Sequence, residues 1–399
     1  MEKAKMPREI WVLVAAALAV ALGYGIVAPI IPQFARSFDV SVTAAGALTS
    51  VFAAMRIAFS TPGGKLIDMF GERKMYMAGI LIVAISSAAS GLAQNYTQLL
   101  ILRGVGGIGS IFFSVSAMSL IIKLSPPGQR GRASSLYGSA FLLGNILGPS
   151  LGSLLAVWGL RLPFFIYAGT LMVSFFVILV ALPEPHRQEV SKEGIEIRPM
   201  TVREAISSPT YRAVLVTSFS HAWTNMGVRL TMIPLATGVA MGYGEWVSGA
   251  ALTAGAIGTA ISLVVAGSWS DRYGRITVIV PGLVIAGIMT IVFGALDSPI
   301  LLVAVALITG LGAGLIQPGQ QGAVADVLDG RPGGKVVSTF QMAGDLGQII
   351  GPLLAGLIAD HFGYSYAFMI SGAILIIAIV AWLPARGDSY RGYTRGEDG

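Results

Sequence analysis

The sequence of 399 residues contains no cysteine, only three histidines and few charged side chains. Without cysteine the chain can form no disulfide, thiol nucleophile or cysteine zinc site, and the histidines lack metal-ligand spacing. Charged residues make up 12% of the chain and hydrophobic residues 54%, whereas soluble domains have about 25% charged residues. This composition excludes a soluble enzyme and a disordered chain, and we expect neither a metal nor a cofactor.

Long apolar runs take the place of the missing charges. A transmembrane helix needs roughly 20 predominantly apolar residues to cross about 30 Å of hydrocarbon, and the chain has twelve such runs. The basic start and first run resemble a signal peptide, but this run continues through Pro29 and Pro32 and further spans follow. We therefore expect an all-α membrane protein of twelve transmembrane helices in two pseudo-symmetric six-helix bundles. The predicted spans are about 10–33, 43–62, 75–94, 98–122, 134–157, 163–182, 213–237, 247–266, 276–295, 300–325, 336–358 and 365–384.

The connections between spans are short except for one charged interval. This interval divides the spans into two sets of six. We predict an N-terminal bundle (1–182), a cytoplasmic linker (183–212) and a C-terminal bundle with a short cytoplasmic tail (213–399).

The positions of the basic residues predict the orientation, because cytoplasmic loops of membrane proteins are enriched in Lys and Arg. With the N-terminus inside, 21 of the 26 basic residues fall on the cytoplasmic side. Arg36 and Arg161 fall outside, and Arg56, Arg103 and Arg229 lie within spans. The net charge of +6 is thus a topology signal, and no nucleic-acid partner is expected. We expect a monomer in a bacterial-type inner membrane, with both termini cytoplasmic.

The two halves repeat one pattern at a constant offset of 203 residues. Chance matches among glycines would not share one offset, so we infer a duplication. Two parallel six-helix repeats are typical of secondary transporters, which bind their substrates near the middle of the membrane. The matched positions are Gly64, Asp68, Gly71, Gly107, Gly109, Arg132, Gly144, Gly148 and Pro149 with Gly267, Asp271, Gly274, Gly310, Gly312, Lys335, Gly347, Gly351 and Pro352. The offset becomes 204 at Trp158-Gly159 and Phe362-Gly363.

A glycine-rich segment with charged residues follows span 2 and is repeated after span 8. Glycines permit a tight turn, and an acid beside basic residues can bind a neighbouring helix N-terminus. We predict loops that act as a conformational latch; the alternative is a basic turn without a mechanical role. The predicted latch residues are Gly64, Asp68, Gly71, Arg73, Asp271 and Arg275.

Span 5 carries Gly144, Gly148, Pro149 and Gly152. Glycines four apart let helices approach closely, and proline bends a helix. We predict a helix-bend motif, with ordinary close packing as the alternative.

These segments resemble the motifs of the major facilitator superfamily. Residues 63–74 resemble its signature loop, and 144–152 resemble the motif of its drug:proton antiporters. Residues 99–109 are similar to its span-4 motif, whose arginine, here Arg103, is tied to proton transfer; Gly106 and Ser153 depart from these patterns. The resemblance covers essentially the whole chain. It implies a cavity lined by spans 1, 4, 7 and 10 and export against an inward proton gradient.

Four charged residues lie within predicted spans: Arg56, Arg103, Arg229 and Asp345. Each costs roughly 2.5–3.5 kcal/mol at the centre of a bilayer, so they should face a wet cavity or one another; Arg56 could instead extend to the cytoplasmic surface. Asp345 is the deepest acid. A carboxyl that moves between an apolar environment and an arginine would bind and release a proton, so we predict proton coupling by Asp345 and Arg103. A permanent Asp–Arg pair is the alternative.

Polar side chains at steps of four give span 7 a polar face. We predict that this face contacts cargo, although each polar residue alone could join helices by hydrogen bonds. Three buried cations against one anion favour an anionic or zwitterionic cargo. The predicted substrate-cavity residues are Arg229, His221, Asn225, Tyr24, Asn145, Gln317, Gln341 and Gln348.

The sequence therefore predicts a proton-coupled transporter that exports small amphiphilic compounds or drugs by alternating access, with a small molecule, protons and the lipid bilayer as its partners. The absence of a Walker loop argues against nucleotide use. An exporter or importer of a specific metabolite (a sugar, an amino acid, an anionic or lipid-like compound) is the alternative. A membrane enzyme or receptor is disfavoured because a nucleophile–base set and a soluble domain are lacking.

Overall fold

The computed structural model describes residues 6–125, 130–182, 198, 200–329, 331 and 334–387. Within these ranges the regular elements are helices and no strand occurs, which confirms the predicted all-α class. The first half contains α1 (Arg8–Val27), α2 (Ile30–Arg36), α3 (Val42–Ala58), α4 (Ser60–Phe70), α5 (Glu72–Gly91), α6 (Tyr96–Leu124), α7 (Arg130–Ala156) and α8 (Leu162–Ala181). The second half contains α9 (Val202–Ser207), α10 (Pro209–Ala222), η1 (Trp223–Met232), η2 (Leu235–Ala240), α11 (Glu245–Tyr273), α12 (Ile276–Phe293), α13 (Pro299–Leu328), α14 (Gly334–Phe362), α15 (Tyr364–Ile377), η3 (Ala378–Trp382) and η4 (Pro384–Gly387).

Nine helical segments of the described chain are long and apolar enough to cross a membrane. Each of the twelve predicted spans coincides with helical structure, including the shorter α3 and the seventh span, which is divided among α10, η1 and η2. Pro29 separates α1 from α2 because proline lacks the N–H that a continuous helix requires. Elements η1 and η2 are π-helices, a rare form that is frequent at functional sites.

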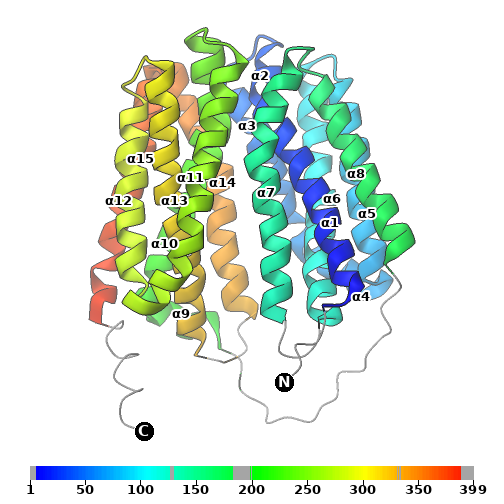
Figure 1. Cartoon of the computed structure of the whole chain (residues 1–399), viewed down its shortest axis with the longest axis vertical. Coiled ribbons are helices and arrows are strands. Elements are labelled where there is room, and N and C mark those ends of the chain that lie inside the picture. The colour runs from blue at the N-terminus through cyan, green and yellow to red at the C-terminus, as the bar shows by residue number, and fades with distance from the viewer. Residues whose placement is uncertain are drawn as a thin grey trace. The chain divides into compact units, whose positions relative to one another are not determined.

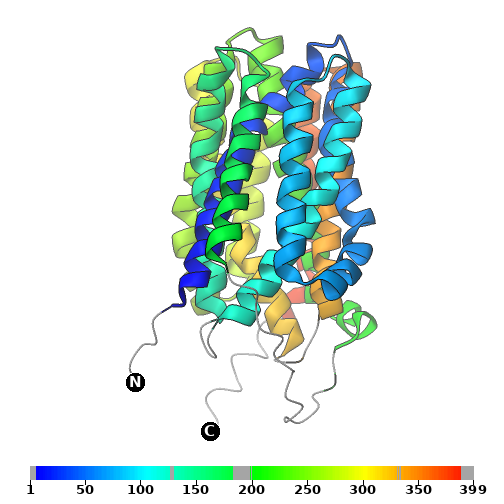
Figure 2. The ribbon, with the colours of Figure 1, turned by 90° about the vertical axis from the view of Figure 1, so that its right-hand side faces the viewer.

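The chain divides into two compact units. Unit 1 comprises Met1–Val40 and Ala47–Ser191, and unit 2 comprises Ser41–Gly46 and Lys192–Gly399. In unit 1, α1 packs against α7 and α8, and α5 packs against α6; α5 and α6 run side by side in both views, in light blue and cyan (Figures 1 and 2). In unit 2, α13 packs between α11 and α12, and α14 packs against α10 and η1 (Figure 1).

The interval that the sequence predicts as a linker contains α9 and the start of α10. Thr201 caps α9 by accepting a hydrogen bond from the Glu204 amide, and the Glu204 carboxylate accepts one from the Thr201 amide. Arg331 and Arg198 pair with the same carboxylate at 3.1 and 3.5 Å. The Thr201 amide and the two guanidiniums hold the pKa of Glu204 below its usual value.

The predicted loop at residues 63–74 is mostly helical. Helix α4 continues to Phe70, and the turn is confined to Gly71, whose φ of 88° suits glycine. Ile67 packs against Phe112 and Met75, and this burial keeps the segment helical in spite of Gly64. Only one of the two predicted turn glycines therefore makes the turn.

The second half repeats this geometry at the offset found in the sequence. Gly267 lies within α11, which continues to Tyr273, and the turn falls at Gly274 with a φ of 92°. Gly159 and Gly363, matched at the offset of 204, also share a positive φ, of 125° and 92°. The backbone of both units therefore supports the inferred duplication.

Candidate functional site

The glycines of the helix-bend motif form the contact between α7 and α1. A Cβ at Gly148 would lie 2.5 Å from the Cα of Gly25, and a Cβ at Gly144 would lie 2.5 Å from Ala21. At Gly152 a Cβ would collide with the carbonyl oxygen of Ile26. Pro149 lies inside α7. The motif therefore lets two backbones pack without intervening side chains, as expected for small residues at a membrane helix interface.

Arg103 lies inside unit 1, on α6, with 3% of its surface exposed. Its guanidinium lies over the ring of Phe52, 4.6 Å from the centroid. Tyr24 stacks on Phe52 at 6.5 Å and meets Tyr167 edge-on at 6.3 Å. Arg103 Nε has no hydrogen-bond partner within the described part of the chain. Cation–π attraction, which is about 2 kcal/mol or more in a desolvated site, stabilises this charge.

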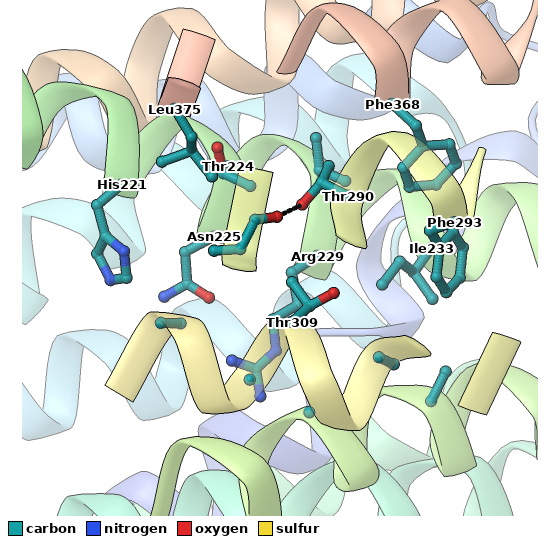
Figure 3. A pocket seen from close by; sticks show the side chains of 17 residues that line it. His221, Thr224, Asn225, Arg229, Ile233, Thr290, Phe293, Thr309, Phe368 and Leu375 are labelled. Carbon is teal, nitrogen blue, oxygen red and sulfur yellow. Dashed lines mark hydrogen bonds between the residues drawn. The ribbon is translucent and has the colours of Figure 1, made fainter. Parts of the chain in front are cut away.

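Unit 2 encloses a pocket that takes three of the predicted cavity residues. His221, Asn225 and Arg229 line it from α10 and η1, and α11, α12, α13 and α15 supply the other walls. Figure 3 shows these three side chains following one another along the pocket, with Ile233, Phe293 and Phe368 at its other end. The structure thus brings the predicted polar stripe of the seventh span into one pocket, and its contact with cargo stays a prediction.

The pocket has polar walls that the sequence analysis missed. Thr290 of α12 and Thr309 of α13 line it, and their hydroxyls donate to carbonyl oxygens four residues earlier in their own helices at 2.7 and 2.8 Å. Threonines that bond their own helix are common in apolar spans, so only the fold singles them out.

The predicted latch residues are associated with a pair of matched ion pairs. Arg275 donates to both carboxylate oxygens of Asp326, at 2.8 and 3.2 Å, and to Ser270 at 3.0 Å. In unit 1, Lys123 pairs with Glu72. The offset of 203 matches Glu72 with Arg275 and Lys123 with Asp326, so the two units conserve the pair with its charges exchanged. This offset was the signal that could have found Asp326.

Of the remaining charged latch residues, the structure describes the side chain of Arg73 but not those of Asp68 and Asp271. Arg73 donates to the Leu179 carbonyl oxygen at 2.7 Å. Asp68 and Asp271 lie in α4 and α11, but their side chains fall outside the described residues. Their binding to helix N-termini stays a prediction.

Among the other predicted cavity residues whose side chains the structure describes, Tyr24, Gln317, Gln341 and Gln348 do not line this pocket. Gln317 and Gln341 are exposed, on α13 and α14, and Asp345 and Gln348 of α14 are partly buried. The Asn145 side chain lies outside the described residues. Asp345 and Arg103 belong to different units, so their coupling stays a prediction.

Repeated helical units with helices of membrane-crossing length, a buried arginine and a partly polar pocket are typical of a membrane transporter. The family model described as Major Facilitator Superfamily matches residues 13–254 and 214–398. The chain belongs to this family.

Curated relatives are similar over nearly their whole length. The chain is 23% identical over 376 residues to "Multidrug resistance protein 2" of Bacillus subtilis, covering 92% of this chain and 93% of the relative. It is 27% identical over 376 residues to "Multidrug resistance protein MdtG" of Escherichia coli O9:H4, covering 90% of each. A bacterial homolog of the human lysosomal transporter Spinster shares the fold, with a TM-score of 0.81, 17% identity and coverage of 96% of this chain and 98% of that one.

Proposed function

We propose that the protein is a proton-coupled secondary transporter that exports small amphiphilic compounds across a bacterial inner membrane by alternating access. The observation that carries this proposal is the similarity, over nine-tenths of the chain, to two bacterial proteins named for multidrug resistance. The α7 glycines that pack on α1 support it, because they form the motif that resembles the drug:proton antiporters.

Proton coupling would use Asp345 and Arg103. Asp345 is partly buried near the middle of α14, and a carboxyl that moves between an apolar environment and an arginine binds and releases a proton. Arg103 is a buried cation whose guanidinium lies over the Phe52 ring, and it contributes a positive charge to the interior of unit 1. In the proposed cycle, Asp345 binds a proton from one side of the membrane and releases it to the other. These two steps drive the change between the outward-facing and inward-facing states.

Conformational control would use the ends of α4 and α11. Asp68 and Asp271, each before a glycine turn, would bind a neighbouring helix N-terminus in one state and release it in the other. The matched pairs Glu72–Lys123 and Arg275–Asp326 hold the adjacent helix ends within each unit. The ion pairs would thus stiffen each unit while the aspartates change partners.

Dye accumulation in expressing cells tests the proposal. Ethidium, a cation, and carboxyfluorescein, an acid loaded as its ester, should be scored side by side. We expect expressing cells to accumulate less of at least one dye than cells with an empty vector, and a protonophore should erase the difference. Asp345→Asn should abolish export, whereas Asp329→Asn, a matched charge loss at a left-handed helix end that asparagine also tolerates, should not. Higher accumulation would indicate an importer, and no difference for either dye would refute export of such compounds.

A second candidate function, transport of a specific anionic metabolite, is favoured by one observation. The Arg229 guanidinium bonds only a hydroxyl and a carbonyl oxygen, at 3.4 Å each, so no carboxylate in the described chain neutralises it. Export of carboxyfluorescein without export of ethidium would favour this second function over export of cationic compounds.

A further inference from the structure

The two units share an equivalent helix contact beside an arginine. In unit 1, a Cβ at Gly107 of α6 would collide with the carbonyl oxygen of Phe52 on α3. In unit 2, a Cβ at Gly310 of α13 would collide with the carbonyl oxygen of Gly255 on α11. The offset of 203 matches Gly107 with Gly310 and Phe52 with Gly255, so the duplication preserved this contact.

The units differ in what fills the space beside this contact. In unit 1, Phe52 covers the Arg103 guanidinium and leaves the arginine 3% exposed. In unit 2, the matched positions are Gly255 and Ala306, and both line the pocket. The large side chains that seal the site in unit 1 are therefore absent at the matched positions of unit 2.

In unit 2 the charge comes instead from another helix. Arg229 of η1 reaches the same place, since a Cβ at Gly255 would lie 3.3 Å from both its Nε and its Nη2. Its hydrogen bonds to Thr259 Oγ1 and the Leu252 carbonyl oxygen use two of the five N–H groups of a guanidinium. Three donors remain for a ligand, and a carboxylate can accept two of them in parallel.

The pocket offers room for such a ligand. The volume open to the centre of a water-sized sphere is about 40 Å³. A single water molecule needs about 10–15 Å³ of such volume. Asn225 lines the pocket next to the arginine, while Ile233, Phe293 and Phe368 give it an apolar end (Figure 3). A charged head and a short apolar body fit this division.

We propose that the pocket of unit 2 binds the carboxylate of a small amphiphilic organic acid, with Arg229 as its counter-ion. The sealed counterpart at Arg103 in unit 1 does not bind it. The inference rests on the proposed transport function only in taking the bound acid as cargo; the binding itself does not depend on transport.

Isothermal titration of the purified full-length protein in detergent, without a pH gradient, tests this site. The probe is benzoate, with benzyl alcohol and benzylamine as neutral and cationic analogues of similar shape. We expect benzoate to bind more tightly than either analogue, and Arg229→Gln to raise its Kd about 10- to 100-fold, as for loss of a hydrogen-bonded charge. Arg212→Gln, the same charge loss on an exposed position of α10, should leave the Kd unchanged.

A second variant keeps the charge and narrows the site. Gly255→Ala places a methyl group 3.3 Å from the guanidinium and should weaken benzoate binding, which supplies a test if Arg229→Gln fails to fold. Equal affinity for benzoate and benzylamine, or unchanged benzoate binding by folded Arg229→Gln or by Gly255→Ala, would overturn the inference. Benzoate binding without dye export would contradict only the transport function, and dye export without benzoate binding would contradict only this site.

Discussion

Gly148→Ala should destabilise the protein, because the α1–α7 contact has no room for a methyl group. The new Cβ would lie 2.5 Å from Gly25 Cα and 2.6 Å from its carbonyl carbon. Both are backbone atoms, so no rotamer change relieves the overlap, and the helices must separate by about 1 Å to restore ordinary contact. A gap of that size forfeits about a quarter to a half of each nearby dispersion contact. Overpacking of this kind costs about 1–3 kcal/mol.

Gly138→Ala is the matched control on the same helix. A Cβ at Gly138 meets no atom within 4 Å, so alanine should be neutral or stabilise α7 by up to about 1 kcal/mol through its higher helix propensity. Thermal unfolding of the purified variants measures the difference; 1 kcal/mol corresponds to about 2–4 °C in a domain of this size. We expect Gly148→Ala to unfold several degrees below Gly138→Ala. Equal midpoints would refute the close helix contact.

Three further outcomes are expected. Thr217→Val should lower the unfolding free energy by about 1–3 kcal/mol in a denaturant titration, because the buried indole N–H of Trp382 loses its acceptor at 2.8 Å; an unchanged midpoint would contradict this. The lowered pKa of Glu204 means that its contacts stabilise α9 above the usual carboxyl pKa and are lost as the pH falls through the lowered value; the hydrogen-exchange protection factors of α9 amides should fall in acid, and Glu204→Gln should remove that dependence. A double-mutant cycle on Arg275 and Asp326 should give a coupling of about 0.2–1 kcal/mol, since the aspartate is 54% exposed; zero coupling would contradict a stabilising role of the pair.

The existence of the helices was predictable from the sequence, because a bilayer demands long apolar runs whatever their order. The ends of the helices were harder to predict from the sequence. The glycines of residues 63–70 predict a loop, but Ile67 packs against Phe112, and this tertiary contact stabilises a helix there. The π-helical form of the seventh span likewise has no signal in the spacing of its polar residues.

The candidate site was predictable where one helix face carries it. His221, Asn225 and Arg229 share a face by their spacing alone, and the structure brings them into one pocket. The walls that complete it, such as Thr290 and Thr309, come from helices whose adjacency no local pattern reveals. A repeat offset carries such long-range information, as it does for Glu72–Lys123 and Arg275–Asp326, and comparing both halves for exchanged charges would have found these pairs.

Transport by the purified protein in lipid vesicles, with the membrane potential clamped, tests the central claim most directly. When vesicles with an acidic lumen are diluted into neutral buffer, protons leaving the lumen should drive a fluorescent amphiphile inward, and Asp345→Asn should not respond to the gradient. Reversing the gradient should reverse the flux. A flux that is the same with and without the pH gradient, or the same in the variant, would contradict proton-coupled export.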